Sequence, residues 1–182
     1  MPRVNQSQFA VLGLLSFEPM SGYDLRQLIA WSVSHFWRES YGQIYPTLRQ
    51  LEKQRLVSKK TQRQKGKPDR NLYSLTPDGH ERLKQWLSQP ATPEVPRNEL
   101  LLKLFFGQWV SEEMSRSQVE NRLQIWEQQL AEYAVIRKRL LAEHASSPGL
   151  PFWEITLSYG EHIAKAQVAW SEETLKKLKD RE

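Results

Sequence analysis

Side chains suited to binding a nucleic acid are concentrated between residues 43 and 70. A helix with a polar outer face is predicted at the start of this segment, and a basic stretch follows it. From Lys53 to Arg70 the sequence has eight Lys and Arg residues and one acidic residue, Asp69. Amide and guanidinium groups can pair with base edges, while ammonium groups bind phosphates without reading sequence. This combination favours a nucleic-acid-binding protein over an enzyme.

The helix predicted after Gly42 should have one buried face and one exposed face. Ile44, Leu48 and Leu51 share the inner face at helical spacing. With Gly42 as the cap, Pro46 lies among the first four helical residues, whose N–H groups have no partner within the helix. The outer face is predicted to read the major groove of a duplex, although an ordinary solvated helix face is the alternative. Its members are Gln43, Tyr45, Thr47, Arg49, Gln50 and Lys53.

A two-stranded hairpin is predicted next, with strands at residues 56–60 and 71–75. Its tip has no large apolar side chain, so we expect it to remain in water. Such a density of positive charge repels itself unless a polyanion binds it, which favours a phosphate-binding wing over a merely solvated loop. The candidate phosphate contacts are Lys59, Lys60, Arg63, Lys65, Lys67 and Arg70.

Further helices are predicted on both sides of this segment. Residues 8–15 carry apolar side chains at helical spacing. A second helix should begin after Ser21 as its N-cap, and one more after Thr76, with Pro77 at its first position. The inward-facing residues expected in that last helix are Leu83, Trp86 and Leu87. Helices followed by a two-stranded wing and a helix predict a winged helix-turn-helix.

The two halves of the chain differ in charge. Residues 1–89 carry 14 Lys and Arg against 7 Asp and Glu, whereas residues 90–182 carry 12 against 14. Three prolines between residues 90 and 96 end the preceding helix and predict a stiff connector. We therefore predict a mainly α protein: a winged helix-turn-helix DNA-binding domain at 1–89, a Pro-rich linker at 90–98 and a helical dimerisation and effector-binding domain at 99–182. Accidental asymmetry of a solvated surface is the alternative reading of the charge.

The second half is predicted to be all-helical. A short apolar helix spans residues 98–110, a long helix spans 115–143 with a capping box of Ser115 and Gln118, and a last helix spans 152–179. The long helices can form an antiparallel hairpin. The last helix carries an apolar stripe of Ile155, Tyr159, Ile163, Ala166 and Trp170.

The first long helix has an apolar seam with a 4-3-4-3 rhythm that only Arg137 interrupts. Because a domain this thin is not expected to have its own core, the seam is predicted to pack against a second copy. The predicted dimer contacts are Val119, Leu123, Trp126, Leu130, Tyr133, Leu140 and Ile163.

Aromatic side chains are frequent in the same half. A cavity between subunits lined by them would suit a small planar effector. The candidate lining residues are Trp109, Trp126, Trp153, Tyr159 and Trp170. The alternative is that each of them anchors the core or the dimer interface.

Neither catalysis nor a cofactor is expected. The four His residues are scattered, no catalytic or Gly-rich phosphate motif is present, and the chain has no Cys. Glu154 and Glu161 could in principle hold a metal, but solvent-facing carboxylates are the simpler reading, so no metal site is expected. The N-terminus lacks a signal-peptide pattern and no apolar stretch reaches about 18 residues. We expect a cytoplasmic protein without membrane contact.

Several phrases of the first half resemble the signature of the PadR family of transcriptional regulators. They are SGYDL at 21–25, FW at 36–37, GQIYPTL at 42–48 and YSLTPDG at 73–79. The layout of the second half is similar to the family's larger subgroup, which has a virulence-activator-like C-terminal domain. The resemblance implies a homodimeric repressor that a phenolic acid or another small aromatic or amphiphilic effector releases from DNA.

Together these features predict a homodimeric regulator that binds a pseudo-palindromic operator in double-stranded DNA. Half-sites should lie about one helical turn apart, or a multiple of it. The alternative function is an RNA-binding or protein-docking winged helix without a specific operator. A small enzyme that uses the C-terminal aromatic residues is a weaker rival.

Overall fold

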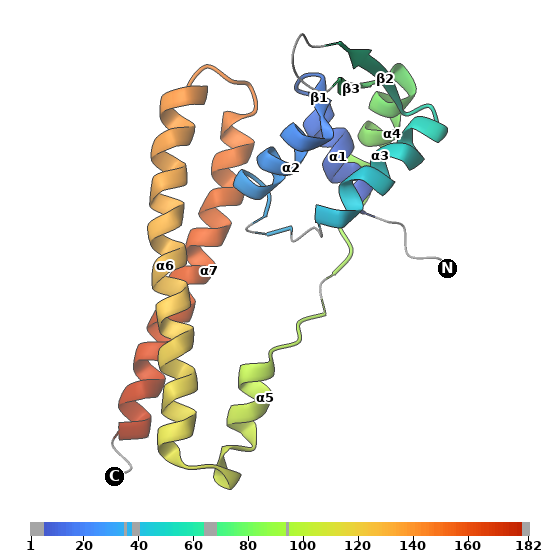
Figure 1. Ribbon diagram of the computed structural model, residues 1–182. Helices are drawn as coiled ribbons and strands as arrows, with labels where there is room; N and C mark the ends of the chain where they lie inside the picture. Colours follow the sequence, from blue (N-terminus) through green and yellow to red (C-terminus); the bar gives the residue numbers. More distant parts are fainter. Residues whose placement is uncertain (1–5, 35, 38–40, 64–68, 94, 180–182) are drawn as a thin grey trace. The chain divides into compact units, whose positions relative to one another are not determined.

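The computed structural model describes residues 6–34, 36–37, 41–63, 69–93 and 95–179 (Figure 1). The chain divides into two compact units, Met1–Pro93 and Glu94–Glu182. The first unit combines helices with a small antiparallel sheet, and the described residues of the second form helices and no strand. The predicted fold class is therefore confirmed.

The first unit is a winged helix-turn-helix. Its elements in chain order are α1 (Ser7–Leu15), β1 (Met20–Ser21), α2 (Gly22–Trp31), the 3-10 turn η1 (Tyr41–Gln43), α3 (Ile44–Lys53), β2 (Val57–Gln62), β3 (Arg70–Leu75) and α4 (Pro77–Leu87). The strands have the spatial order β1-β3-β2, with every neighbouring pair antiparallel. The hairpin of β2 and β3 is the predicted wing, whereas β1 was not predicted because two residues show no alternation.

The helices α2 and α4 have the predicted residues, Ser21 and Thr76, as their N-caps. Ser21 Oγ accepts the N–H of Asp24, and the Asp24 carboxylate accepts the N–H of Ser21, which completes a capping box for α2. Thr76 Oγ1 accepts the N–H of Gly79 at 3.0 Å, and Pro77 follows as the first residue of α4. The cap predicted for α3 was wrong, because Gln43 and not Gly42 precedes its first residue.

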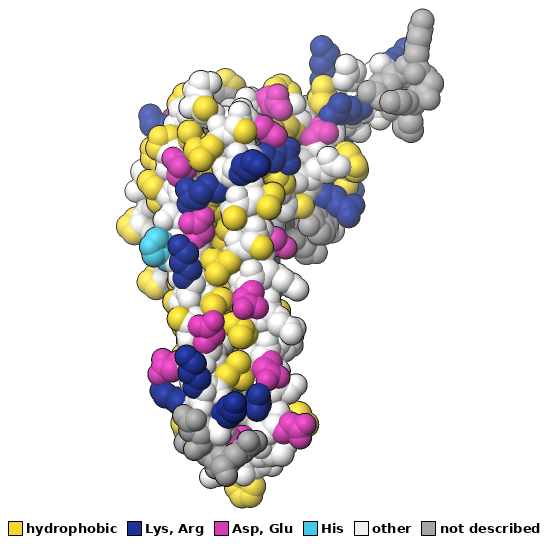
Figure 2. All heavy atoms as spheres, turned by 90° about the vertical axis from the view of Figure 1, so that its left-hand side faces the viewer, with side chains coloured by type: hydrophobic (Ala, Val, Ile, Leu, Met, Phe, Trp, Pro, Cys, Tyr) yellow, Lys and Arg dark blue, Asp and Glu magenta, His cyan; other side chains and the backbone are white. Residues whose placement is uncertain are grey.

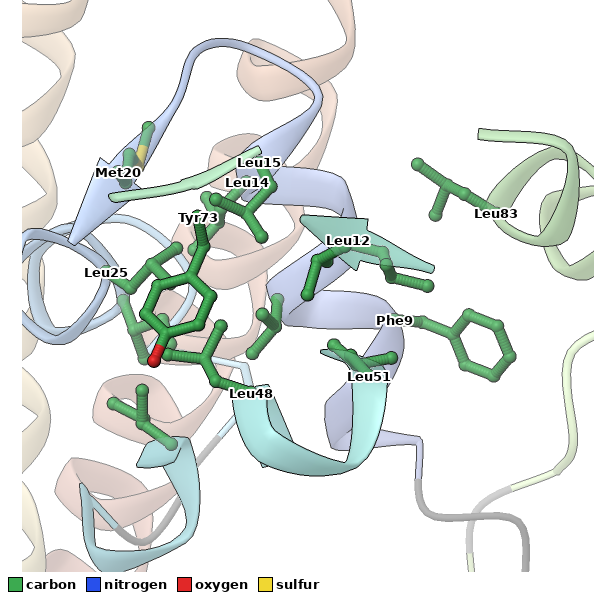
Figure 3. Close-up of a cluster of buried hydrophobic side chains, with 14 residues drawn as sticks. Phe9, Leu12, Leu14, Leu15, Met20, Leu25, Leu48, Leu51, Tyr73 and Leu83 are labelled. Carbon is green, nitrogen blue, oxygen red and sulfur yellow. The ribbon is translucent and has the colours of Figure 1, made fainter. Parts of the chain in front are cut away.

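One hydrophobic core holds the first unit together. Leu12 of α1, Leu25 of α2 and Leu48 of α3 are fully buried, and Tyr73 of β3 points into the same cluster (Figure 3). The inner face predicted for α3 is thus confirmed. Trp86 of α4 stacks on Phe9 with ring centroids 4.5 Å apart. Leu83 is buried as predicted, but Leu87 is 67% exposed, so its inward placement was wrong.

The second unit is built on two long helices. Its elements are α5 (Glu99–Phe105), the 3-10 turn η2 (Gly107–Trp109), α6 (Glu112–His144) and α7 (Leu150–Lys179). The α6 helix begins earlier than predicted, because Ser111 Oγ accepts the N–H of Met114 and caps it. Ser115, the predicted cap, is buried inside the helix. Acidic residues in the first turn favour this earlier start, since they face the positive end of the helix dipole.

The helices α6 and α7 pack on each other as a hairpin, and this corrects the predicted dimer seam. Tyr133 and Leu140 of α6 are buried in one cluster with Leu157 and Ala164 of α7. Other predicted seam residues also lie inside the chain: Val119 is fully buried, Leu123 is partly buried, and Trp126 and Leu130 pack against the same cluster. Trp126, Leu130, Tyr133 and Leu140 of the seam therefore pack within the hairpin of the same chain.

Ion pairs join α6 and α7 at Arg137, the residue that interrupts the apolar seam. Arg137 of α6 donates from Nε and Nη2 to the two carboxylate oxygens of Glu161 of α7, at 2.9 and 3.0 Å. Its Nη1 lies 3.6 Å from Oε1 of Glu154. The carboxylates weighed as metal ligands or solvent-facing groups therefore bind an arginine. None of the helices that the structure describes is both long enough and apolar enough to cross a membrane.

Candidate nucleic-acid interface

The outer face of α3 presents five of its six predicted residues to solvent. Pro46 stands in the first turn, where no intrahelical N–H bond is lost. The exposed members of the predicted face are Gln43, Tyr45, Arg49, Gln50 and Lys53. Their amide, phenol, guanidinium and ammonium groups can donate hydrogen bonds to base edges and phosphates.

Thr47 does not belong to this face, which corrects the prediction. Its side chain is 3% exposed, between Ile44 and Leu51 on the inner stripe. Positions 44, 47, 48 and 51 follow the i, i+3, i+4, i+7 rule for one buried helix face. The threonine was placed at the flank of the outer face although this spacing puts it inside.

Strand β2 of the wing leaves the core after its first residue. Val57 is buried, whereas all the following residues of β2 are exposed. Across the hairpin Thr61 Oγ1 donates to Asn71 Oδ1 at 2.9 Å, next to the pairing of Gln62 with Arg70. A strand of this kind is not held by burial, so its exposed side chains are free to meet a ligand.

The predicted phosphate contacts of the wing have different outcomes. Lys59, Lys60 and Arg63 are exposed. Lys65 and Lys67 lie outside the described residues. Arg70, by contrast, forms an ion pair with Asp24 at the start of α2, so it is not an unpaired phosphate contact.

The carboxylate of Asp24 is held in its charged form. Partial burial raises its pKa, but the hydrogen bonds from Ser21 and the charge and hydrogen bond of Arg70 outweigh burial and leave the pKa below its ordinary value. Sequence reasoning noticed this segment only as a helix cap and as part of the SGYDL phrase. Its partner Arg70 is 46 residues away, and no local pattern indicates that contact.

The aromatic residues predicted to line an effector cavity are in different environments. Trp109 in η2 and Tyr159 in α7 are 79% and 62% exposed. Trp126 and Trp153 pack against the hairpin core, where Trp153 also meets the ring of His144 edge-on at 5.4 Å. Trp170 is partly exposed on α7. Of these residues, Trp126 and Trp153 are thus core anchors, whereas Trp109 and Tyr159 lie outside the core.

Two family models match the chain, one for each unit. The transcriptional regulator PadR-like family matches residues 11–85. The virulence activator alpha C-term family matches residues 96–179. Residues 86–95, which include most of the Pro-rich segment, lie between the two matches.

Curated and solved relatives match nearly the whole chain. The negative transcriptional regulator PadR of Bacillus subtilis (strain 168) is 29% identical over 174 residues, which cover 92% of this chain and 94% of the relative. The crystal structure of Bacillus subtilis PadR in complex with operator DNA has a TM-score of 0.82 and 26% identity, covering 94% of this chain and 98% of that one. Its complex with p-coumaric acid has a TM-score of 0.77 at the same identity and coverage.

Proposed function

The chain belongs to the PadR-like family of DNA-binding transcriptional regulators, and on this premise we propose that it is a homodimeric repressor that acts in the cytoplasm on a pseudo-palindromic operator. The family is one of regulators and not of enzymes. Repression is supported by the relative described as a negative regulator, and operator binding by the relative solved with operator DNA.

The observation that carries this proposal is the pairing of an exposed polar helix face with an exposed basic hairpin in one unit. Arg49 and Gln50 of α3 have the donor groups that suit guanine and adenine in the major groove. Lys59 and Lys60 of β2 suit phosphates, which supply affinity without sequence information. The helix reads the operator, and the wing strengthens binding to any duplex.

A salt titration of operator binding tests the role of the wing. Replacing Lys59 and Lys60 by Ala should weaken binding to all sequences and reduce the slope of log K against log salt by about one per lost phosphate contact. Lys176 and Lys179 of α7, changed together to Ala, remove the same charge from the second unit and should leave the slope unchanged. An unchanged slope in the wing variant would contradict the phosphate assignment.

The RNA-binding or protein-docking alternative makes a different prediction. DNA from upstream of the chain's own gene, challenged with an excess of unrelated duplex, separates the two functions. A specific regulator keeps its labelled operator under this competition, because specific binding is about 10³–10⁷ times tighter than non-specific binding. Complete displacement by the unrelated duplex would favour the alternative.

A dimer contact is proposed on the outer side of α7. Phe152, Ile155, Tyr159 and Ile163 are exposed and follow one helical stripe, opposite the face that packs on α6. Apolar side chains are scattered among charged ones along the hairpin face drawn in Figure 2. Of the dimer contacts predicted from the sequence, Ile163 lies on this stripe. Exposed apolar stripes of this kind mark protein–protein contacts, and a second copy is the partner that a two-fold operator requires.

Release by a small aromatic effector is proposed from the relative solved with p-coumaric acid. A supporting observation lies in the hairpin, where the buried Nε1 of Trp126 has no acceptor among the described residues. A buried donor without a partner costs about 1–3 kcal/mol, which a ligand oxygen would recover. An effector must also bind the DNA-free state more tightly than the DNA-bound state.

Operator release by p-coumaric acid tests this effector proposal. Titration of the acid into the protein–operator complex should dissociate it in the wild type. Replacement of Trp126 by Phe should raise the acid concentration required and leave operator affinity without acid unchanged. Trp170→Phe is the matched control. Equal responses of the two variants would exclude Trp126 as the ligand donor.

A further inference from the structure

We propose that Gly22 and Asp24, both in the first turn of α2, are positioning residues for operator recognition. Gly22 sets the place of Tyr45 on α3, and Asp24 holds the base of the wing through Arg70. This inference rests on the proposed function, since it concerns how the two parts of the DNA-binding surface are placed with respect to each other.

The space at Gly22 is occupied by the ring of Tyr45. A Cβ added to Gly22 would lie 2.6 Å from Cε1, 3.0 Å from Cζ and 3.2 Å from Cδ1 of that ring. Gly22 is the first residue of α2, so helical backbone and not an unusual φ is required there. Glycine is therefore required at position 22 by the lack of space beside the Tyr45 ring, and not by the backbone conformation. Tyr45 is 53% exposed, so its ring has room to move, and any side chain at position 22 must shift it.

Asp24 connects the same turn to the wing. Its Oδ2 accepts the N–H and the Oγ–H of Ser21, both at 2.9 Å, and the Nη2 of Arg70. Ser21 belongs to β1, which pairs with β3 only at Met20 with Tyr73 and at Ser21 with Leu72. The ion pair extends this short attachment to Arg70, where β3 begins. It therefore ties the start of β3 to the first turn of α2.

The contacts of Gly22 with Tyr45 and of Asp24 with Arg70 both come from the first turn of α2. A duplex presents its base edges and its flanking phosphates at fixed separations, and phosphate contacts set the register of the protein on the groove. A helix and a wing that read both must keep a fixed separation too. The first turn of α2 touches α3 at Tyr45 and the wing at Arg70, so it fixes that separation.

Replacing Asp24 by Asn is a test for which two explanations predict opposite changes in the affinity for operator DNA. Loss of a carboxylate makes the protein more positive and frees Arg70, so charge alone predicts tighter DNA binding. Positioning predicts weaker operator binding, by about tenfold, as expected for groups that share a contact network. Asp69→Asn is the matched control, because it removes the exposed carboxylate that precedes Arg70 in the sequence. If Asp24→Asn binds as tightly as Asp69→Asn or more tightly, the role of Asp24 is overturned.

A second variant keeps the proposal testable if Asp24→Asn unfolds the unit. Gly22→Ala should not lower the melting temperature, since Ala favours helix over Gly and the displaced ring is exposed. It should nevertheless weaken operator binding about tenfold and leave non-specific binding unchanged. In a Tyr45→Ala background the same change should have no further effect. An equal loss in both backgrounds would overturn the role of Gly22.

The wild type separates failure of this inference from failure of the proposed function. If the wild type binds its upstream DNA no better than unrelated DNA, the proposed function fails and the inference falls with it. If the wild type is specific while Gly22→Ala and Asp24→Asn both bind like the wild type, the inference alone is overturned. Arg70→Met combined with Asp24→Asn should bind no more weakly than either single variant, because both remove one contact.

Discussion

Arg137 shows how a single residue can disturb a sequence pattern and still stabilise the element that carries it. The arginine occupies a seam position that the apolar rhythm reserves for a hydrophobic residue, and Glu161 of α7 meets it there with two hydrogen bonds. Paired N–H···O bonds between guanidinium and carboxylate add directional specificity to their energy. The pair therefore favours one alignment of α6 on α7 over alignments shifted by a turn.

The carboxylate of Glu161 should make the stability of the hairpin depend on acid pH. The hydrogen bond from Arg137 lowers the pKa of Glu161 below its ordinary value of 4.5, despite partial burial that opposes this. A group with a lowered folded-state pKa stabilises the fold above its unfolded pKa, and this contribution is lost as pH falls through the folded value. Urea midpoints of the wild type should therefore decline below about pH 4.5, and Glu161→Gln should decline less.

The same variant should lose about 1–2 kcal/mol at neutral pH, since it leaves the guanidinium with a weaker partner. Glu143→Gln is the control: Glu143 pairs with Arg139 one turn away on the exposed side of α6. Pairs of that kind contribute about 0.3–0.5 kcal/mol. Equal losses of unfolding free energy in the two variants would show that the Arg137–Glu161 pair stabilises the protein no more than a surface pair does.

Residue-scale prediction of the site succeeded where a helix period decides the answer. Spacing placed Ile44, Leu48 and Leu51 inside, and the same rule applied to Thr47 would have placed it inside too. It failed where the partner is distant in sequence. Arg70 resembles any other basic residue of the wing until the fold brings Asp24 to it.

At the scale of elements, the junction between the wing and α4 depends on close backbone packing. Thr76 Oγ1 donates to the carbonyl oxygens of Arg55 and Leu56, at 2.8 and 3.0 Å. A Cβ on Gly79 would lie only 2.0 Å from the carbonyl oxygen of Leu56. Arg55 itself has a φ of 61°, so the chain turns sharply at this point. The glycine three residues after the threonine is thus required by the backbone of another segment.

Gly79→Ala should destabilise the first unit severely, because backbone cannot move aside as a side-chain tip can. Overpacking of this kind costs about 1–3 kcal/mol or more. Gly13→Ala in α1 is the matched control, since a Cβ there meets nothing within 4 Å. It should be neutral or gain about 0.5–1 kcal/mol from helix propensity. Thermal unfolding of the two variants measures the difference, and a similar melting temperature for both would contradict the packing argument.

Elements with local start signals were predictable from the sequence, and elements defined by distant pairing were not. Ser21 and Thr76 mark their helices because a capping hydroxyl and the N–H it accepts lie within three residues. The strand β1 exists only through its pairing with β3. The start of α6 was misplaced because Ser111 and Ser115 both satisfy the local cap pattern, and burial of Ser115 settles the choice.

At the scale of the whole molecule, α7 has more apolar surface than one partner helix covers. Its inner face, with Leu157 and Ala164, completes the hairpin with α6. Its outer stripe, with Ile155 and Tyr159, remains exposed. Sequence periodicity detected apolar positions on both long helices but could not tell which of them pack within one chain. Trp126, Leu130, Tyr133 and Leu140 of the predicted seam pack within the hairpin, so the dimer proposed above uses the outer stripe of α7.

A charge placed on the outer stripe should separate the protomers without unfolding them. Ile155→Glu puts a carboxylate into the proposed apolar contact, where it would be buried without a partner. Lys165→Ala, on another face of α7 and also exposed, changes the net charge by the same amount away from the stripe. At micromolar concentration we expect the first variant to sediment as a monomer and the second as a dimer, with equal helical circular dichroism.

The monomeric variant then tests why a dimer is needed. Two linked reading heads gain an effective local concentration, so loss of the dimer should weaken binding to a full palindrome by about 100-fold or more. Binding to a single half-site should stay the same, because α3 and the wing are untouched. Changing the spacing between the half-sites by about five base pairs, half a helical turn, should also reduce the affinity of the wild type for the operator. The affinity of the monomeric variant should not change. A monomeric Ile155→Glu that still binds the palindrome as the wild type does would show that one reading head suffices.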